Sequence, residues 1–512
     1  MTFQSILFAR AGDGDTQEVT EAPAFFRDLN LDQIVDSITA EWKEYNLAPF
    51  FYARLNDLDG IRYRQEVMRD LEDRVLVEEI NAFAKQMRVM RQRLDQAKNL
   101  DYYKYASEKC FLGAAAIYAG AVERLSRALC AIHVNSRGLQ GFREYLTAYL
   151  ASTLFRNLSL QTAKLTADLA VIQYNIFLRK DGITVRHHDG ETDYSQSIAQ
   201  RFEKFTREAS KDYWVEVYKS TGMNHIEERV LVRVAALHPE TFQALDLFCA
   251  AYSSFIDETI VRFDREIQFY VAYLSHAAKF RRIGLSFSIP QLSQTSKAEG
   301  VRETFDLALA EKLLGQKSAV VLNDFYLADQ ERIFVVSGPN HGGKTTFARL
   351  FGQLHYLTSL GCPVPGREAR LFLCDQLFTH FEREEDMTNL RGKLQDDLVR
   401  IHEILTQATP NTILVMNEVF SSTTVSDAAL LSQRVMTKMS DLDLLAVWVT
   451  FLDELASFNR KTVSVVAGTA PGDPNNRTFK LERRPADGLA YALTIAQKHR
   501  VTYECLRERI KP

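Results

Sequence analysis

The fold of the C-terminal half of this chain is decided by eight residues, Gly338-Pro339-Asn340-His341-Gly342-Gly343-Lys344-Thr345. They match the pattern Gly-x-x-x-x-Gly-Lys-Ser/Thr. A buried-strand pattern at residues 333–336 precedes them, and a helical pattern at residues 346–358 follows. A chance glycine turn would predict neither the Lys-Thr pair nor the flanking strand and helix. The context therefore predicts a strand, a phosphate-binding loop and a helix in succession.

The residue types in this loop suit phosphate binding. Glycines let backbone N–H groups turn inward, and the start of the following helix adds partial positive charge. Lys344 is predicted to reach the β- and γ-phosphates and Thr345 to ligate Mg²⁺, so ATP and Mg²⁺ are the expected cofactors. The predicted nucleotide-contacting residues are Gly338, Pro339, Asn340, His341, Gly342, Gly343, Lys344, Thr345 and Thr346.

A second strand is predicted to complete the site. Residues 412–416 form a buried-strand pattern that ends in Asn417 and Glu418. Asn417 occupies the usual aspartate position, so it is predicted to assist Thr345 at the metal without supplying a charge. Glu418 is either a solvated residue after a strand or the catalytic base. Its pairing with the phosphate loop favours the base, so Glu418 and Lys344 are the predicted catalytic residues.

The sequence pattern divides the chain into two parts. After about residues 285–300, short apolar runs alternate with helical stretches, which predicts a mostly parallel α/β sheet. The predicted strands are residues 319–322, 333–336, 412–416, 444–449 and 463–467. We therefore predict an α/β P-loop NTPase domain at residues 286–512, preceded by a long, mainly α-helical region at residues 1–285.

The first part carries helical apolar spacing from residue 25 to residue 280 with few prolines. Residues 111–122 are predicted to be a buried helix, and residues 239–280 one continuous amphipathic arm. Turn residues around a short alternating run at 181–191 predict a β-hairpin between helices. Its His187-His188 pair suggests a metal site, but neighbouring strand residues point to opposite faces, which favours an exposed hairpin.

Composition and charge limit the class of protein. The chain has 512 residues, 46% of them hydrophobic and 25% charged, which predicts two or three globular domains. The formal net charge of -4 gives no global attraction for nucleic acid, so DNA contact would need local basic patches. Six cysteines without a C-x-x-C pair indicate reduced thiols used as core filler in a cytoplasmic protein. No membrane association is expected, because the longest apolar stretch falls short of the roughly 20 residues a span needs.

With these motifs, the chain resembles the MutS family of DNA mismatch-repair ATPases. The family's phosphate loop carries Gly-Pro-Asn before Gly-Gly-Lys, and residues 338–344 repeat this order with His341 in the middle. Residues 416–418, Met-Asn-Glu, and the helical half upstream extend the resemblance, which is clearest across residues 300–512. It implies an ABC/MutS-type ATPase that binds ATP and Mg²⁺, forms a homodimer through its ATPase domains and contacts DNA.

The chain departs from the family pattern at several places. Gly392-Lys393-Leu394 replaces the family's Ser-Thr-Phe, so the serine that would reach a partner subunit's nucleotide is absent. Lys393 either substitutes electrostatically or is an ordinary surface lysine, and the surface role is favoured. Residues 420–424 keep small hydroxyl side chains where the family has a dimer-facing loop. Phe451 replaces the histidine of the family's Thr-His switch and cannot hydrogen-bond to a phosphate.

By the same resemblance, residues 1–285 are expected to be the family's helical core and lever arms, with a reduced clamp-like insertion at about 181–235. The stretch before residue 25 is too short for the family's mismatch-reading domain, so base-mismatch reading is not expected. The basic clusters at 88–93 and 279–282 either meet DNA phosphates or are solvated helix faces and ion-pair stems. The second alternative is the more common one.

Two hypotheses of different kinds follow. The leading hypothesis is a MutS-like ATPase that couples nucleotide state and dimerisation to DNA binding, in repair or recombination. The rival is a non-hydrolysing, nucleotide-dependent switch or scaffold for protein partners, motivated by Asn417, Gly392 and Phe451. An ABC transporter subunit fits less well, because the chain lacks the sequence Leu-Ser-Gly-Gly-Gln and a predicted membrane span.

Overall fold

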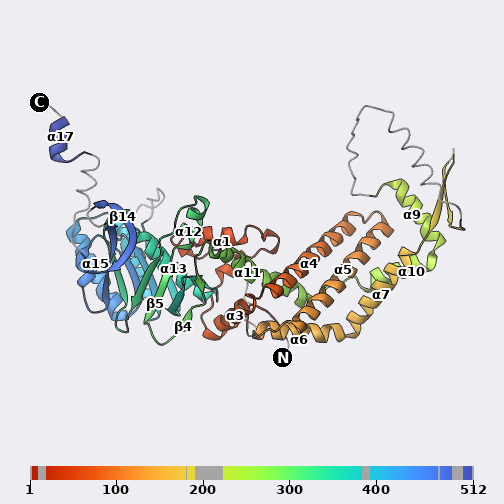
Figure 1. The fold of residues 1–512 in the computed structure, drawn as a ribbon, viewed down its shortest axis with the longest axis horizontal. Helices are drawn as coiled ribbons and strands as arrows, with labels where there is room; N and C mark the ends of the chain where they lie inside the picture. Colours follow the sequence, from red (N-terminus) through yellow and green to blue (C-terminus); the bar gives the residue numbers. More distant parts are fainter. Residues whose placement is uncertain are drawn as a thin grey trace. The chain divides into compact units, whose positions relative to one another are not determined.

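The computed structural model describes residues 3–9, 19–179, 182–190, 223–382, 392–470, 473–486 and 500–509. Contacts divide the chain into two compact units (Figure 1). Unit 1 comprises Met1–Phe3, Asp73–Val134 and Gln140–Asp264, and unit 2 comprises Gln4–Glu72, Asn135–Leu139 and Arg265–Pro512. Each unit is therefore assembled from segments that are distant in the sequence. The division at residue 285 separates a predicted helical region from a predicted ATPase domain, whereas these units are defined by contacts. That functional division therefore stays a prediction.

Unit 1 is mainly helical, as the apolar spacing predicts. Its elements are α4 (Arg74–Asn99), α5 (Lys104–Ala131), α6 (Arg137–Ala151), α7 (Thr153–Ala170), β1 (Tyr174–Arg179), β2 (Gly182–His187), α9 (His225–Leu237) and α10 (Pro239–Ala251). Helix α6 begins in the short 135–139 segment of unit 2. The two longest, α4 and α5, pack against each other. Asp73 starts α4 by accepting a hydrogen bond from Val75 N at 2.8 Å, and Asn224 and Glu227 form a capping box at the start of α9.

The predicted hairpin is present, but it begins earlier than expected. Strand β1 pairs antiparallel with β2, with Tyr174 opposite His187. His188 Nδ1 lies 3.2 Å from Asn175 Oδ1, and the His187 ring packs 5.0 Å from the His238 ring. Among the described residues, no group of three or more His, Cys, Asp or Glu side chains could hold a metal ion. Residues 191–222 of the predicted clamp-like insertion lie outside the described part of the chain.

The predicted continuous arm at 239–280 is wrong. Helix α10 ends at Ala251, and α11 (Glu258–Arg281) begins after a break. Asp257 produces the break, because its Oδ1 accepts from Ile260 N at 3.0 Å and caps the new helix. Its own N–H donates to Tyr118 Oη at 3.1 Å, which fixes the turn on α5. An apolar pattern alone does not reveal such a side-chain cap.

Residues 111–122 lie inside α5, and Ala115, Tyr118 and Val122 are fully buried there, as predicted. No helix within the described ranges has the length and apolar character needed to cross a membrane. All six cysteines are free thiols, but only Cys362 and Cys374 are buried. Their interpretation as core filler therefore holds for those two and is wrong for exposed Cys130.

Unit 2 combines helices with three sheets among its described residues. Its helices are η1 (Ala24–Phe26), α1 (Leu31–Thr39), η2 (Lys43–Tyr45), α2 (Ala48–Tyr52), α3 (Leu58–Asp70), most of α11, α12 (Leu307–Gly315), α13 (Lys344–Ser359), α14 (Lys393–Gln407), α15 (Val425–Leu442), η3 (Asp453–Ser457) and α17 (Tyr503–Arg509). Its strands are β3 (Phe287–Ser288), β4 (Gln291–Ser293), β5 (Glu299–Thr304), β6 (Asn323–Leu327), β7 (Ile333–Ser337), β8 (Val364–Pro365), β9 (Glu368–Phe372), β10 (Gln376–Phe381), β11 (Thr412–Asn417), β12 (Leu445–Val449), β13 (Thr462–Ala470) and β14 (Asp473–Arg483).

The largest sheet has the strand order β10-β11-β12-β7-β13-β14. All neighbours are parallel except the edge pair β13 and β14. This confirms the prediction of a mostly parallel sheet and four of its five predicted strands. The strand predicted at 319–322 is wrong, because the chain becomes a strand only at Asn323, in the separate sheet β4-β9-β5-β6.

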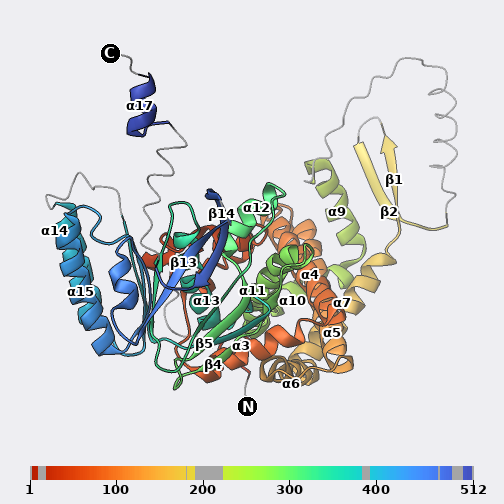
Figure 2. The ribbon, with the colours of Figure 1, turned by 60° about the vertical axis from the view of Figure 1, so that its left-hand side comes forward.

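Helices cover both faces of this sheet, which explains its continuous apolar strands. On one face Val335 belongs to a cluster with Met436 of α15. On the other face the Phe334 ring contacts the Phe351 ring of α13, with centroids 6.1 Å apart. Helices α14 and α15 contribute to the same cluster and lie side by side in Figure 2. The sheet therefore holds its strand ends rigidly between two helical layers.

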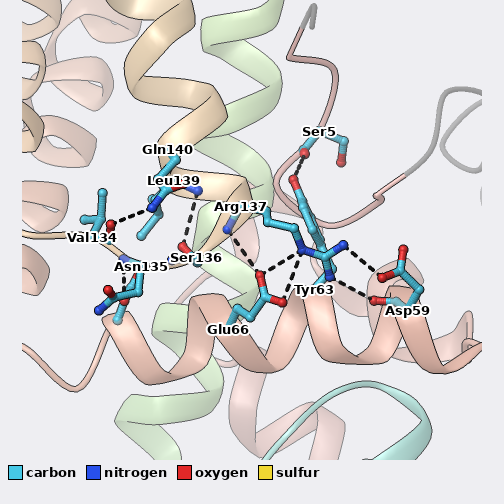
Figure 3. A network of polar contacts seen from close by, with 11 residues as sticks. Ser5, Asp59, Tyr63, Glu66, Val134, Asn135, Ser136, Arg137, Leu139 and Gln140 are labelled. Carbon is cyan, nitrogen blue, oxygen red and sulfur yellow. Dashed lines mark hydrogen bonds and ion pairs between the residues drawn. The ribbon is translucent and has the colours of Figure 1, made fainter.

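Helix α3 ties distant segments of unit 2 together (Figure 3). Tyr63 Oη donates to Ser5 O at 2.7 Å. On the same helix, Glu66 and Asp59 both accept from the Arg137 guanidinium, at 3.0 and 2.8 Å. The short segment 135–139 is therefore anchored to α3 by paired charges, although most of this network is solvent-accessible and contributes only about 1 kcal/mol per pair.

Candidate nucleotide site

The glycine-rich loop lies between β7 and α13, where the sequence predicts it. Gly338 and Gly343 have φ angles of 111° and 98°, which side chains rarely adopt. A Cβ at Gly338 would lie 3.0 Å from Ala467 N, and one at Gly342 would lie 2.9 Å from Ala467 Cβ. The glycines are therefore required both by backbone geometry and by the close approach of β13. His341 also has positive φ, at 59°, and is exposed.

Lys344 is the first residue of α13 and is 8% exposed. Its Nζ donates to Gly338 O at 2.8 Å, to Pro339 O at 3.3 Å and to Asn340 Oδ1 at 3.3 Å. Burial lowers the pKa of Lys344, and the nearby Glu418 carboxylate opposes that shift. The lysine side chain thus folds back onto the loop, and all three of these hydrogen-bond acceptors are neutral oxygen atoms.

Thr345 is linked to the end of β11. Its Oγ1 donates to Asn417 Oδ1 at 2.9 Å. Strand β12 separates β7 from β11, so this contact spans the carboxyl ends of three parallel strands. Such ends are the usual ligand-binding edge of an open parallel sheet. Thr346, the next residue of the helix and the last of the predicted nucleotide-contacting residues, is half-buried.

Glu418 follows Asn417 in the left-handed backbone region, with φ of 52°. Its N–H donates to Val449 O at 2.9 Å, which fixes the backbone against β12. Its carboxylate acts on the pKa of Lys344, so the two predicted catalytic side chains lie in one electrostatic site. A strained conformation for a non-glycine residue costs on the order of 1 kcal/mol and is characteristic of functional sites.

Two departures from the family pattern, at Lys393 and Phe451, occupy different positions around this site. Lys393, at the start of α14, forms an ion pair with Glu382, and Ser421 Oγ donates to the same carboxylate at 3.3 Å. Phe451, just beyond β12, is 53% exposed. The preceding Thr450 is buried, and its N–H donates to Val336 O at 3.1 Å. The structure therefore keeps the threonine next to β7 and leaves the aromatic ring in solvent.

Sequence reasoning missed the contribution of β14. Arg477 Nε donates to Asn340 O at 3.3 Å, and the backbone of Phe479 would lie 3.8 Å from a Cβ at Gly343. Phe479 has a φ of 56°, and Asn323 Nδ2 donates to its carbonyl at 3.2 Å. Strand β14 is polar and lies at the edge of the sheet, so no local sequence pattern places it beside the loop.

The residues present fit a bound nucleotide phosphate with a divalent cation. The start of the 16-residue helix α13 provides unpaired N–H groups and the positive end of its dipole. A buried ammonium and a hydroxyl lie in the same turn, and Asn417 and Glu418 supply oxygen atoms opposite them. Oxygen atoms of this kind suit Mg²⁺. Thr345 and Asn417 are the two predicted metal residues that the structure brings together.

The basic cluster at 88–93 is partly used within unit 1. Arg91 Nη1 lies 2.6 Å from Asp264 Oδ2, and Asp264 is nearly inaccessible. Arg91 is thus the stem of an ion pair, one of the alternatives that the sequence left open for this cluster.

Together these features define an α/β domain with a glycine-rich loop at the carboxyl edge of a mostly parallel sheet. Residues 334–503 match the family described as MutS domain V. Through this domain the chain is similar to proteins of the MutS family.

Three relatives illustrate the similarity. The DNA mismatch repair protein MutS of Lysinibacillus sphaericus is 24% identical over 246 residues, 47% of this chain and 28% of that protein. MutS of Fervidobacterium nodosum is 28% identical over 140 residues, 27% of this chain and 17% of that protein. The DNA mismatch repair protein MSH3 of Kluyveromyces lactis is 26% identical over 148 residues, 28% of this chain and 14% of that protein. The matched part of the chain thus spans between 14% and 28% of these relatives' length.

Proposed function

We propose that this protein is an ATPase that couples nucleotide state and dimerisation to DNA binding, in DNA repair or recombination. The observation that carries the proposal is the meeting of two strand ends. Lys344 and Thr345 start α13, while Asn417 ends β11 and Glu418 follows it within reach of them. This pairing of a glycine-rich loop with an acidic strand end is the arrangement that phosphoryl transfer requires.

Each residue has a defined task in this proposal. Bound Mg²⁺ would supply charge neutralisation for the phosphates. Loop N–H groups and Lys344 would hold the β- and γ-phosphate oxygens, and Thr345 and Asn417 would position the metal. Glu418 would orient the attacking water and accept its proton. Because Asn417 lacks the usual charge, we expect turnover to be slow or triggered by DNA.

The DNA and dimer parts of the proposal rest on the similarity to MutS proteins. The curated relatives are described as DNA mismatch repair proteins. By analogy, the α/β domains would associate as a homodimer, and the helices of residues 1–285 would act as core and lever arms around the DNA. We further propose that the protein works in the cytoplasm and away from membranes.

The test is steady-state ATP hydrolysis by the purified protein, with branched, mismatched and plain duplex DNA and without DNA. We expect DNA to stimulate turnover and Glu418→Ala to reduce it by about 100-fold or more, the usual effect of removing a general base. The Lys344→Ala variant serves as a second blank. Turnover in the wild type that equals both blanks, with or without DNA, would refute the ATPase.

A second candidate function has specific support. Asn417 weakens the metal site, Lys393 forms a pair within its own chain, and Phe451 cannot contact a phosphate through a hydrogen bond. These features suit a switch that binds ATP without hydrolysing it and recruits protein partners. Tight, Lys344-dependent ATP binding without turnover, together with nucleotide-dependent dimerisation in analytical ultracentrifugation, would favour this switch over the ATPase.

A further inference from the structure

Strand β14 brings a second cation to the glycine-rich loop. Arg477 Nε donates to the backbone oxygen of Asn340 at 3.3 Å, while Lys344 Nζ donates to the side-chain oxygen of the same asparagine at 3.3 Å. Two cationic side chains that are far apart in the sequence, Lys344 and Arg477, thus both hydrogen-bond to Asn340 in the loop.

The path of the sheet edge explains this convergence. Strand β13 pairs with β7 as far as Val466 opposite Ser337. It then continues past the end of β7, and Ala467 lies against the loop. The register between β13 and β14 shifts at this point, and Arg477 stands opposite Thr469. Such irregularities at a sheet edge often redirect a side chain toward a site.

Two cationic and two acidic side chains act on one another at the loop. Burial lowers the pKa of Lys344, and the charge of Arg477 lowers it further. The charges of Glu418 and Asp453 raise the pKa of Lys344, so all four side chains interact electrostatically. Bringing two cations together has a free-energy cost that a bound anion would offset.

We propose that Arg477 binds the terminal phosphate of the nucleotide in the same chain, beside Lys344. This inference rests on the proposed function. The α- and β-phosphates of a nucleotide are enclosed by the loop N–H groups, and the lysine reaches the β- and γ-phosphates. Arg477 approaches the outer rim of that loop, where only the γ-phosphate would remain to be bound. A guanidinium can hold two phosphate oxygens at once.

The proposal gives Arg477 a role that two other candidates among the described residues, Lys393 and Phe451, do not fill. Lys393 is engaged by Glu382, and Phe451 offers no polar atom at its side chain. Arg477 would therefore make the site distinguish ATP from ADP, because only ATP carries the γ-phosphate. In this way β14 would act as the sensor of nucleotide state.

The experiment is isothermal titration calorimetry with Mg²⁺ and either ADP or the non-hydrolysable ATP analogue adenylyl imidodiphosphate. We expect Arg477→Gln to weaken binding of the analogue by about tenfold, the usual effect of losing a charged hydrogen bond, and to change ADP binding by less than about twofold. Arg477→Lys keeps the charge and should restore part of the loss. Arg484→Gln removes an equal charge just beyond the other end of β14 and should change neither affinity.

Two results would overturn the assignment of Arg477. One is equal weakening of both ligands, which indicates a structural role in the loop. The other is unchanged binding of the analogue. A wild-type protein that binds neither ligand in a Lys344-dependent manner is a different outcome, because it overturns the proposed function itself and the Arg477 assignment with it. Thermal unfolding of each variant verifies that the fold is retained.

Discussion

At the scale of single residues, Asn417 is the feature that sets this site apart from an ordinary phosphate-loop enzyme. Its amide oxygen accepts a hydrogen bond from Thr345 at 2.9 Å, so it lies where the proposed function needs a metal-shell residue, but it carries no charge. The geometry needs no rearrangement for a carboxylate to replace the amide, since the two side chains have nearly the same shape.

The Asn417→Asp variant should therefore bind Mg²⁺ more tightly. Affinity for hard cations rises with the number of charged oxygen ligands. We expect the Mg²⁺ concentration for half-maximal nucleotide binding to fall by roughly fivefold, measured by titrating Mg²⁺ at fixed ATP. Asn417→Ala, which loses the Thr345 partner, should shift the requirement the other way. An unchanged requirement in the aspartate variant would mean that residue 417 does not face the metal.

The sequence was enough to locate Lys344, Thr345, Asn417 and Glu418, because each belongs to a local motif beside a buried strand. Their catalytic and metal-binding roles remain predictions. Arg477 could not be located in this way. Its place beside the loop depends on the pairing of two edge strands and on a shift in their register, which is a property of the sheet rather than of the residues around it.

At the scale of elements, α15 ends in a charged clamp at the opposite edge of the sheet. Asp443 terminates α15 with a φ of 59°, and three cations surround its carboxylate. These are Lys461 at 2.6 Å, Arg332 at 3.0 Å and Lys297 at 3.3 Å. Partial burial acts to raise the pKa of Asp443, but the bonds from Lys461 and Arg332 prevail and lower it to about 2. The clamp connects the end of α15 to the starts of β7 and β13.

The Asp443→Asn variant should lose stability only where the carboxylate is charged. Because the folded-state pKa lies below the ordinary value of 3.8, the contribution is fully present above about pH 4 and is lost as pH falls toward 2. After discounting for partial exposure, we expect a loss of about 1 kcal/mol at pH 6. Urea unfolding between pH 3 and pH 6 measures it, with exposed Asp441→Asn as control. A difference that persists undiminished at pH 3 would contradict this account.

The sheet also marks the limit of sequence-based prediction at this scale. Strands β7, β11, β12 and β13 were predicted because they are buried on both faces and form continuous apolar runs. Strands β10 and β14 were missed, since polar residues interrupt the first and dominate the second. The break between α10 and α11 was missed for a related reason, because it depends on the cap at Asp257.

At the scale of the whole chain, unit 2 contains a segment that local sequence pattern could not assign. Residues 5–7 are buried, and side chains from distant helices satisfy their backbone groups. Ile6 N donates to Glu266 Oε2 at 2.9 Å, and Ile6 O accepts from Tyr270 Oη at 2.7 Å. Leu7 O accepts from Arg64 Nε at 3.0 Å. The segment therefore hydrogen-bonds to three buried side chains, Glu266, Tyr270 and Arg64, which makes it an integral part of the core.

The Leu7→Ala variant tests this integration. Leu7 is completely inaccessible, so truncation removes apolar contacts and leaves a cavity. Such a change typically lowers the free energy of unfolding by about 2–5 kcal/mol, and we expect a loss of about 3 kcal/mol here because the site can relax partly. Leu430→Ala is the matched control, because Leu430 lies on α15 in the same unit and is 54% exposed. Its loss should stay below about 0.5 kcal/mol. Urea unfolding of both variants provides the comparison. Equal, small losses would mean that the segment lies on the surface of unit 2 without contributing to its core.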